Sequence, residues 1–186
     1  DYRSLNLITK RVAYPLPRLD QCLDALGNNN YWFTVCDLRS GYYQVALAPQ
    51  DRDKTAFVSH RGLYRYTVLP MGLSNAPSTF QRLMDMVMSG LLFETCLVYL
   101  DDIIIFSRTL TEHLQRLEEV LQRLVATGLK LKPSKSRLLQ TRVEFLGHVI
   151  SSKGIETDPA KTEAIAKWPV RASLRSGREG IFGPLR

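Results

Sequence analysis

The spacing of apolar side chains along the chain predicts three amphipathic helices. The first runs from Leu16 to Gly27, where the glycine ends it. The second follows Ser74 or Asn75, either of which can cap its start, and Pro77 is tolerated in its first turn. The third ends at Gly128. The apolar faces of these helices consist of Leu19, Leu23 and Leu26; of Phe80, Leu83, Met84, Val87 and Met88; and of Leu114, Leu117, Leu121, Leu124 and Val125.

Strand-forming residues concentrate in four further segments, at 31–38, 54–68, 97–106 and 145–150. The second segment breaks at His60-Arg61-Gly62 and is predicted to form a hairpin. The third is split by Asp101-Asp102, while the first ends at Asp37. Strands and helices therefore interleave as strand, hairpin, helix, hairpin, helix and strand. This order predicts an α+β fold, with an antiparallel sheet and helices packed on one face.

Length and composition favour one principal domain. The chain has 186 residues, of which 45% are hydrophobic, which is enough for a single core. Its longest apolar stretches, Leu97–Leu100 and Ile103–Phe106, are far too short to span a bilayer, so no membrane association is expected. The formal charge of +7 suits a polyanionic partner, although four arginines and one glutamate place +3 of it in the last sixteen residues.

Cysteine and histidine positions favour a reducing compartment without a zinc site. Cys22, Cys36 and Cys96 are odd in number and show no Cys-x-x-Cys pair, which excludes a disulfide framework of the secreted type. His60, His113 and His148 do not have ligand spacing. The expected location is intracellular, in the cytoplasm or nucleus.

The paired aspartates have the clearest chemical meaning. Asp101 and Asp102 lie between two apolar strand segments, so folding brings two carboxylates to a tight hairpin beside buried residues. Two such charges about 4 Å apart repel by roughly 4 kcal/mol at an effective dielectric constant near 20, which favours a bound cation or a proton. Asp37, at the end of its own strand, is the natural third ligand. The alternative is an ordinary polar hairpin tip, with Asp37 as a turn residue.

Several motifs together resemble those of reverse transcriptases, in the form found in gypsy-type long-terminal-repeat retrotransposons. Tyr99-Leu100-Asp101-Asp102 resembles the signature of that family. The other blocks of the family occur in order: Asp1 to Asn6, Phe33 to Tyr42, Lys54 to Phe57, Leu69 to Gln81, Gly128 to Leu131 with Lys135, and Phe145 to His148. The resemblance covers roughly residues 1 to 170.

The resemblance implies a set of metal-binding and nucleotide-binding residues. Asp37, Asp101 and Asp102 would hold two Mg²⁺ ions, with Mn²⁺ as a substitute and the Leu38 carbonyl as an additional ligand. Nucleotide contacts would come from Leu38, Arg39, Tyr42, Met71 and Gly72. Among these residues, Tyr42 would select deoxynucleotides because its ring would collide with a ribose 2′-hydroxyl. Gly72 would allow the nucleotide to approach the backbone closely. Core packing is the alternative role for Tyr42.

The resemblance also implies contacts with the primer and the leaving group. Tyr99 and the Phe145-Leu146-Gly147 segment would lie against the primer or template, although either can equally be ordinary core. Lys135 would approach the leaving pyrophosphate, whereas a lysine in a loop is more often simply solvated.

The same resemblance divides the chain into parts of a polymerase. Residues 1–170 would form a palm with a partial, truncated fingers subdomain: fingers parts near 1–30 and 45–74, and palm parts near 31–44 and 75–155. The fingers subdomain of this family begins before the Asp-Tyr-Arg block and carries a lysine and an arginine that hold the triphosphate, so a fragment is expected. Residues 171–186 depart from the family pattern and are predicted to be a disordered tail.

The expected function is that of an RNA-directed DNA polymerase domain, a nucleotidyltransferase that adds deoxynucleotides to a primer. Its implied partners are an RNA or DNA template with primer, deoxynucleoside triphosphates and the other domains of a pol polyprotein. Two alternatives are a non-catalytic nucleic-acid-binding remnant and a translated transposon relic.

Overall fold

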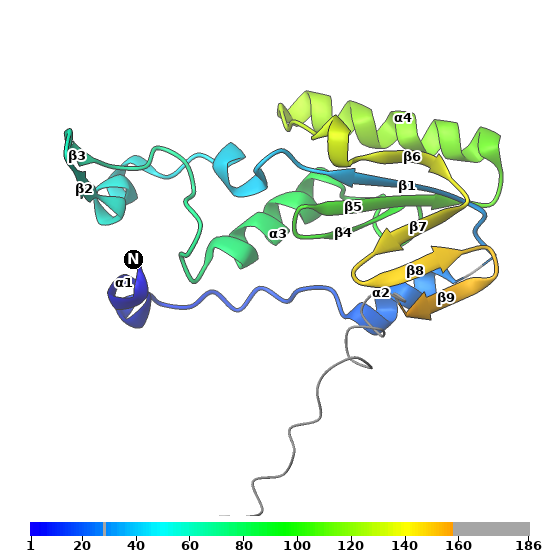
Figure 1. Cartoon of the computed structure of the whole chain (residues 1–186), viewed down its shortest axis with the longest axis horizontal. Coiled ribbons are helices and arrows are strands. Elements are labelled where there is room, and N and C mark those ends of the chain that lie inside the picture. The colour runs from blue at the N-terminus through cyan, green and yellow to red at the C-terminus, as the bar shows by residue number, and fades with distance from the viewer. Residues whose placement is uncertain (28, 158–186) are drawn as a thin grey trace, which may run out of the picture.

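A four-stranded antiparallel sheet forms the centre of the molecule. The structure is a computed structural model that describes residues 1–27 and 29–157. The strands lie in the order β4 (Cys96–Tyr99), β5 (Asp102–Ser107), β1 (Trp32–Asp37) and β6 (Arg137–Gln140) (Figure 1). Strands β4 and β5 form the predicted hairpin interrupted by the paired aspartates. Because β1 pairs with β5 on one side and with β6 on the other, the first predicted strand is an inner strand of the sheet.

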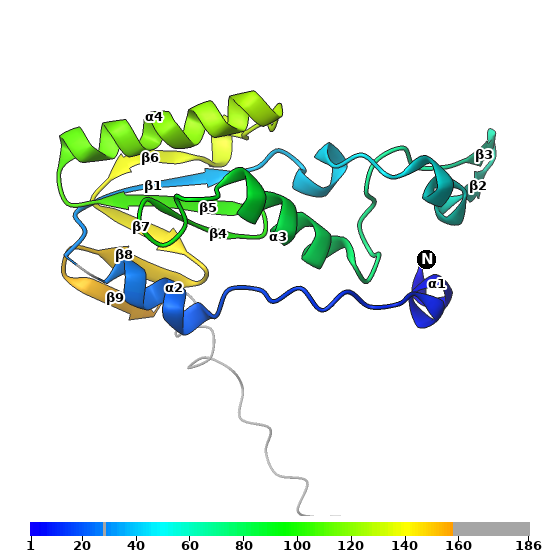
Figure 2. The same cartoon turned by 180° about the vertical axis from the view of Figure 1, so that it is seen from behind.

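Helices α3 (Ala76–Val87) and α4 (Leu110–Thr127) cover one face of this sheet (Figures 1 and 2). Their apolar residues form one core with alternate residues of the strands. This first core includes Cys36, Leu38, Phe80, Met84, Val87, Met88, Val98, Ile103, Ile105, Leu117, Val120 and Leu124. The prediction of an α+β fold with an antiparallel sheet is confirmed, and α3 and α4 share one face of that sheet as expected.

The opposite face is covered by helix α2 (Leu19–Leu26) and a second antiparallel sheet of β7 (Arg142–Phe145), β8 (His148–Ser151) and β9 (Gly154–Thr157). These elements pack on the remaining strand residues and make a second core, whose members are Cys22, Leu26, Phe33, Leu97, Ile104, Phe106, Val143, Phe145 and Ile150.

The prediction of one strand over residues 145–150 is wrong. Leu146 and Gly147 have φ values of 49° and 78°, so the chain turns between β7 and β8 and the two strands pair as a hairpin. Leucine is rarely found in the left-handed region, which explains why an apolar run concealed the turn.

A small outlying part lies at the end of the molecule away from β7, β8 and β9 (Figure 1). It contains helix α1 (Arg3–Ile8) and the hairpin of β2 (Phe57–Ser59) and β3 (Gly62–Tyr64). The hairpin predicted within residues 54–68 is confirmed, with shorter strands because residues 49–55 form a 3₁₀ turn.

The start of α3 differs from the predicted capping. Asn75 occupies the N-cap position but makes no side-chain cap. Its amide instead binds the extended N-terminal segment, accepting from Val12 N at 3.1 Å and donating to Lys10 O at 2.9 Å. Ser74 does not cap the helix either, because its buried Oγ has no partner among the described residues. A distant segment therefore takes the contact that local sequence assigned to the helix.

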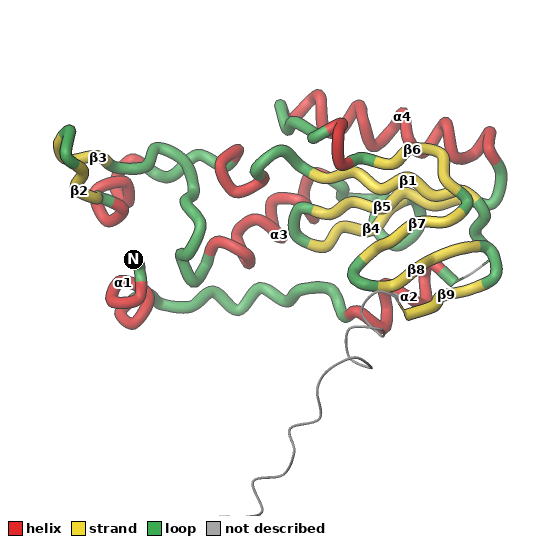
Figure 3. The backbone as a smooth tube through the Cα atoms, viewed as in Figure 1, coloured by secondary structure: helices red, strands yellow, loops and turns green. Residues whose placement is uncertain are grey.

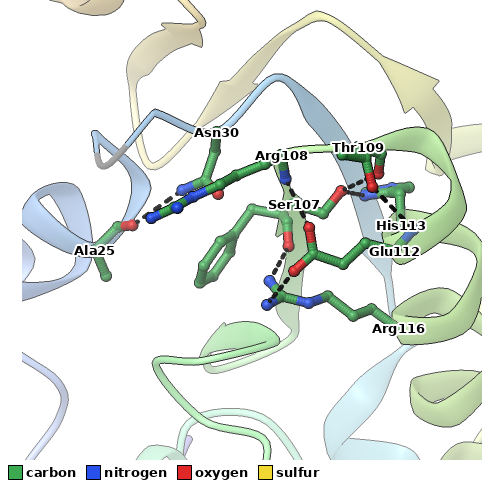
Figure 4. A network of polar contacts seen from close by, with 9 residues as sticks. Ala25, Asn30, Ser107, Arg108, Thr109, Glu112, His113 and Arg116 are labelled. Carbon is green, nitrogen blue, oxygen red and sulfur yellow. Dashed lines mark hydrogen bonds and ion pairs between the residues drawn. The ribbon is translucent and has the colours of Figure 1, made fainter.

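A polar network fixes the start of α4 (Figure 4). Thr109 is the N-cap and its Oγ1 accepts from Glu112 N at 3.2 Å, while Glu112 Oε2 accepts from Arg108 N at 3.0 Å. The buried His113 ring lies between Ser107 Oγ at 3.0 Å and Thr34 Oγ1 at 2.8 Å. These contacts join α4 to β5 and β1.

The predicted division places residues 1–30 near the fingers and residues 171–186 in a tail. Helix α2, placed near the fingers by the predicted division, shares the second core with the central sheet; the division into fingers and palm itself stays a prediction. The predicted tail at 171–186 lies outside the described residues. Among the helices that the structure does describe, none has both the length and the apolar run needed to cross a membrane.

Candidate active site

The three predicted aspartates come together at one end of the central sheet. Asp37 is the last residue of β1 and Asp102 is the first of β5, and the two are directly paired across the strands. Asp101 lies in the two-residue turn between Tyr99 and Asp102. The Leu38 N–H donates to the Asp101 carbonyl at 3.2 Å, which joins the end of β1 to this turn.

Strand alternation assigns Asp37 and Asp102 to a definite face. Residues two apart in a strand lie on the same side of a sheet, so Asp37 shares a face with Phe33, and Asp102 shares one with Ile104. Both Phe33 and Ile104 belong to the second core. The paired carboxylates therefore lie opposite α3 and α4, on the face that carries β7, β8 and β9.

Burial and like charge make this a costly place for carboxylates. Burial, with the neighbouring Asp101 and Asp37 charges, raises the pKa of Asp102 above its ordinary value of 3.8, and Lys135 acts in the opposite direction. The Lys135 ammonium lies 3.3 Å from Asp37 Oδ2, whose side chain is only 18% exposed. The predicted approach of Lys135 to a pyrophosphate is untested; in this structure it compensates Asp37.

The residue types at this end of the sheet suit a hard divalent cation. Carboxylate oxygens are the ligands that Mg²⁺ prefers, and clustered negative charge gains from a cation. Within residues 1–27 and 29–157, however, no three His, Cys, Asp or Glu side chains are arranged so that they could hold a metal ion as they lie. The backbone gathers the carboxylates, and their side chains would have to turn toward a shared ion.

Tyr42 lies close to this group on the 3₁₀ turn Gly41–Gln44. Its ring packs edge-on against Phe80, with the centroids 5.3 Å apart. Burial, and to a smaller extent the Asp101 charge, raises the pKa of the Tyr42 phenol. The neighbouring Gly41 allows this approach, because a Cβ there would lie 2.7 Å from Phe80 Cζ. Tyr42 is thus half-buried against the first core and also faces the electrostatic field of the aspartates.

Leu38 and Arg39 are held by a segment that precedes Lys135. Arg39 N donates to Lys130 O at 2.9 Å, and Leu38 forms an antiparallel bridge with Leu131. Leu38 has a buried side chain, whereas Arg39 is exposed. The motif block Gly128 to Leu131 therefore lies beside the residues that directly follow Asp37.

Met71 and Gly72 are fastened to the N-terminal segment. Asn6 Nδ2 donates to Gly72 O at 2.8 Å, and Asn6 Oδ1 accepts from Ser74 N at 2.8 Å. Gly72 has a φ of 94°, and Met71 is exposed. No hydrogen bond or ion pair within the described part of the chain links this loop to the aspartates.

The predicted primer-contacting residues gather on the same face as Asp37 and Asp102. Phe145 is a member of the second core, and Tyr99 and Leu146 pack against that core. Gly147 completes the turn between β7 and β8. The carboxylates and the β7–β8 hairpin therefore lie on the same face of the central sheet.

One residue at the site was missed by sequence reasoning. Gln81 on α3 is fully buried and binds Val98 O and Leu100 N on either side of Tyr99, at 3.1 Å and 2.8 Å. The available signal was its helical position one turn before Asp85 and seven residues before Met88, which puts a polar side chain beside an apolar face.

Comparison with known proteins agrees with this geometry. The family described as "Reverse transcriptase (RNA-dependent DNA polymerase)" matches residues 1–150. A Pol polyprotein of transposon 297 from Drosophila melanogaster is 45% identical over 170 residues, covering 91% of this chain and 16% of that relative. The Pol polyprotein of transposon gypsy, from the same organism, is 40% identical, with 91% and 16% coverage. The chain thus spans about a sixth of these relatives.

Solved structures give the same result for the fold. A foamy viral protease–reverse transcriptase in complex with an RNA/DNA hybrid has 27% sequence identity and a TM-score of 0.79, with 90% of this chain and 22% of that chain covered. The foamy viral enzyme in complex with double-stranded DNA gives a TM-score of 0.81 at 27% identity, with coverage of 90% and 29%. The match over most of the sequence, together with the paired aspartates at the end of the sheet, means that the chain belongs to the reverse transcriptase family.

Proposed function

We propose that this chain is the polymerase core of an RNA-directed DNA polymerase, and that it adds deoxynucleotides to a primer by phosphoryl transfer. The reaction joins the primer 3′-hydroxyl to the α-phosphate of a deoxynucleoside triphosphate and releases pyrophosphate. Such a reaction needs positioning and charge stabilisation more than covalent help from the protein.

The observation that carries this proposal is the direct pairing of Asp37 with Asp102, beside a turn that carries Asp101. Three carboxylates at one sheet end would be destabilising without a compensating role. A polar hairpin tip explains Asp101 alone, since that residue is exposed, but it does not explain the half-buried Asp102 opposite Asp37.

Reverse transcriptases generally use divalent metal ions, and the aspartates are the proposed ligands here. Asp37, Asp101 and Asp102 would hold two Mg²⁺ ions or Mn²⁺ in their place, with the Leu38 carbonyl as a further ligand. When bound, these ions supply activation of the attacking hydroxyl and neutralisation of the leaving phosphate. Lys135, now paired with Asp37, would be free to turn to the pyrophosphate once a cation takes its place.

The remaining residues would select and orient the reactants. Tyr42, fixed by its contact with Phe80, would exclude a ribose 2′-hydroxyl and so favour deoxynucleotides. Arg39, Met71 and the Gly72 backbone would lie beside the incoming nucleotide. Gly72 suits this role because glycine has no side chain to block approach, and its φ of 94° is one that other residues rarely adopt.

Primer and template would lie on the face that carries the carboxylates. Tyr99 and the Phe145–Gly147 turn are the proposed contacts, and the foamy viral relatives are bound to an RNA/DNA hybrid and to double-stranded DNA. The other domains of the Pol polyprotein are further proposed partners, because the relatives are much longer. The proposed location is the cytoplasm, the nucleus or virus-like particles.

Primer extension on an RNA template with Mg²⁺ and deoxynucleotides tests the proposal. The Asp101→Asn variant should lose on the order of 100-fold or more in extension rate, because the transition state loses charge stabilisation. Asp24→Asn, which removes an exposed carboxylate on α2, is the matched control and should extend like the parent chain.

Each other outcome has a distinct meaning. Equal extension by the parent chain and Asp101→Asn would reject a catalytic role for the carboxylates. Retained duplex binding without extension by any form would favour a non-catalytic nucleic-acid-binding remnant over the polymerase.

A further inference from the structure

A buried glutamine supports the turn that carries the paired aspartates. Gln81 has an exposed fraction of 0%. Its Nε2 donates to Val98 O at 3.1 Å and to Asp85 Oδ1 at 2.8 Å, and its Oε1 accepts from Leu100 N at 2.8 Å. Val98 and Leu100 flank Tyr99, so one side chain holds the end of β4 and the first residue of the turn.

The partners of Gln81 allow only one orientation of its amide. The Asp85 carboxylate and the Val98 carbonyl are acceptors, so they require the NH₂ side of the amide. The Leu100 N–H is a donor and requires the oxygen. A rotated amide would place oxygen against both acceptors and an N–H against a donor, which would leave three buried or half-buried groups unsatisfied.

The residue that Gln81 binds has a strained backbone. Leu100 has a φ of 55°, the left-handed region that two-residue hairpin turns require and that glycine or asparagine usually supplies. A leucine there needs support from its surroundings. The Gln81 oxygen supplies a partner for its N–H, immediately before Asp101.

The support continues to the N-terminal strap, residues 9–18, which runs extended between α1 and α2 beside α3 (Figure 3). The Tyr14 hydroxyl in this strap donates to Asp85 Oδ2 at 2.6 Å. Asp85 therefore joins the strap to Gln81 through its two oxygens. The strap is also bound to the start of α3, where Asn75 contacts Lys10 and Val12.

We propose that Gln81 is a positioning residue for the turn bearing Asp101 and Asp102, and that Asp85 and Tyr14 fix the orientation of its amide. The chain of contacts transmits the position of the strap to the carboxylates. The catalytic consequence rests on the polymerase function proposed above, whereas the structural consequence does not.

Gln81→Met is the primary test, because methionine has a similar length and shape but forms none of the three hydrogen bonds. Steady-state extension should show kcat reduced about tenfold or more, since small misplacements of reacting groups are costly, with primer–template affinity unchanged. Gln122→Met, which alters an exposed glutamine on α4, is the matched control. Asp85→Leu should lower kcat as well. Asp85→Asn should keep the kcat of the parent chain, because its amide oxygen can still accept a hydrogen bond from Gln81.

Amide hydrogen exchange of Leu100, followed by NMR, gives a readout that does not depend on activity. The Leu100 N–H should exchange slowly in the parent chain and in Asp85→Asn, and rapidly in Gln81→Met and Asp85→Leu. If Gln81→Met does not fold, Tyr14→Phe, which removes one half-buried hydroxyl, serves in its place and should accelerate this exchange.

The two readouts separate this proposal from the proposed function. Parent-like kcat and parent-like Leu100 exchange in a folded Gln81→Met or Tyr14→Phe variant would overturn the positioning role. A parent chain without activity whose Leu100 exchange still responds to these substitutions would reject the polymerase function and leave the support of the turn standing.

Discussion

At the residue scale, Asp102 shows how function and stability oppose each other. Its pKa is raised by burial and by the nearby charges of Asp101 and Asp37. A raised carboxylate pKa means that the folded state binds protons more tightly than the unfolded state. This group therefore makes the metal-free fold less stable as pH rises from 3.8 through the folded-state pKa.

Asp102→Asn is predicted to stabilise the metal-free chain at pH 7 while abolishing extension. The neutral amide removes the unfavourable free energy of a half-buried charge. The melting temperature in EDTA should therefore rise by roughly 2–4 °C. The difference should shrink near pH 3.8, where the unfolded carboxylate also takes up a proton. Thermal melts monitored by circular dichroism at several pH values provide the measurement.

Asp24→Asn again provides the control, because an exposed carboxylate should leave the melting temperature nearly unchanged. A lower melting temperature for Asp102→Asn in EDTA would contradict the electrostatic account of the site.

Sequence reasoning found the residues of this site whose chemistry is unusual for their surroundings. The aspartates stood out because they interrupt apolar strands. Gln81 did not, because its role depends on contacts with two backbone groups of the β4–β5 hairpin, which follows α3 in the chain. The left-handed Leu100 and the contact of Lys135 with Asp37 are likewise tertiary features that no local pattern contains.

At the element scale, α4 is joined to the sheet by a buried polar contact as well as by apolar packing. His113 contacts Ser107 of β5 (Figure 4), and its other ring nitrogen contacts Thr34 of β1. Burial, with the nearby Arg116 charge, lowers the pKa of this imidazole below its ordinary value of 6.5. The neutral ring can donate with one nitrogen and accept with the other, which satisfies both hydroxyls.

The lowered pKa of His113 predicts a loss of stability in acid. The folded state resists protonation that the unfolded state accepts, so the free energy of unfolding should fall as pH drops below 6.5. His113→Gln should cost about 1–3 kcal/mol at pH 7.5 through imperfect hydrogen bonding, and should flatten the pH dependence. Urea unfolding between pH 5.5 and 7.5 measures both effects.

His60→Gln changes an exposed histidine between β2 and β3. Its free energy of unfolding should depend on pH as in the parent chain. An unchanged slope in His113→Gln would show that another group causes the acid sensitivity.

Elements with strong periodicity were predicted well, and those set by tertiary contacts were not. The amphipathic faces of α3 and α4 were sufficient to place these helices. The break between β7 and β8 was missed because a leucine adopts the turn conformation. Strands β6 and β9 were also missed: β6 has four exposed residues and only a partial pairing with β1, so its sequence shows no burial pattern.

At the scale of the whole molecule, the central sheet separates structural support from candidate chemistry. One face packs on α3 and α4, and the other carries Asp37, Asp102 and the second core. This division follows from strand alternation, because successive side chains of a strand point to opposite faces of the sheet. The last residue of a strand therefore lies on only one of the two faces. Tyr42 packs on the face that carries α3 and α4, and Gln81 of α3 binds the residue that precedes Asp101.

The comparisons agree with the fold over most of the chain, yet the matched relatives are about six times as long. The activity of the whole polyprotein therefore stays a proposal for this chain. One claim can be tested on this chain alone, namely that its three aspartates form a divalent metal site.

Binding of Mn²⁺, followed by electron paramagnetic resonance in the presence of primer–template and a non-hydrolysable deoxynucleotide analogue, tests that claim most directly. The parent chain and Asp24→Asn should bind Mn²⁺ alike, while Asp102→Asn should bind at least about tenfold more weakly, because a neutral amide replaces a negatively charged carboxylate ligand. Equal Mn²⁺ affinity in the parent chain and in Asp102→Asn would contradict the proposed site.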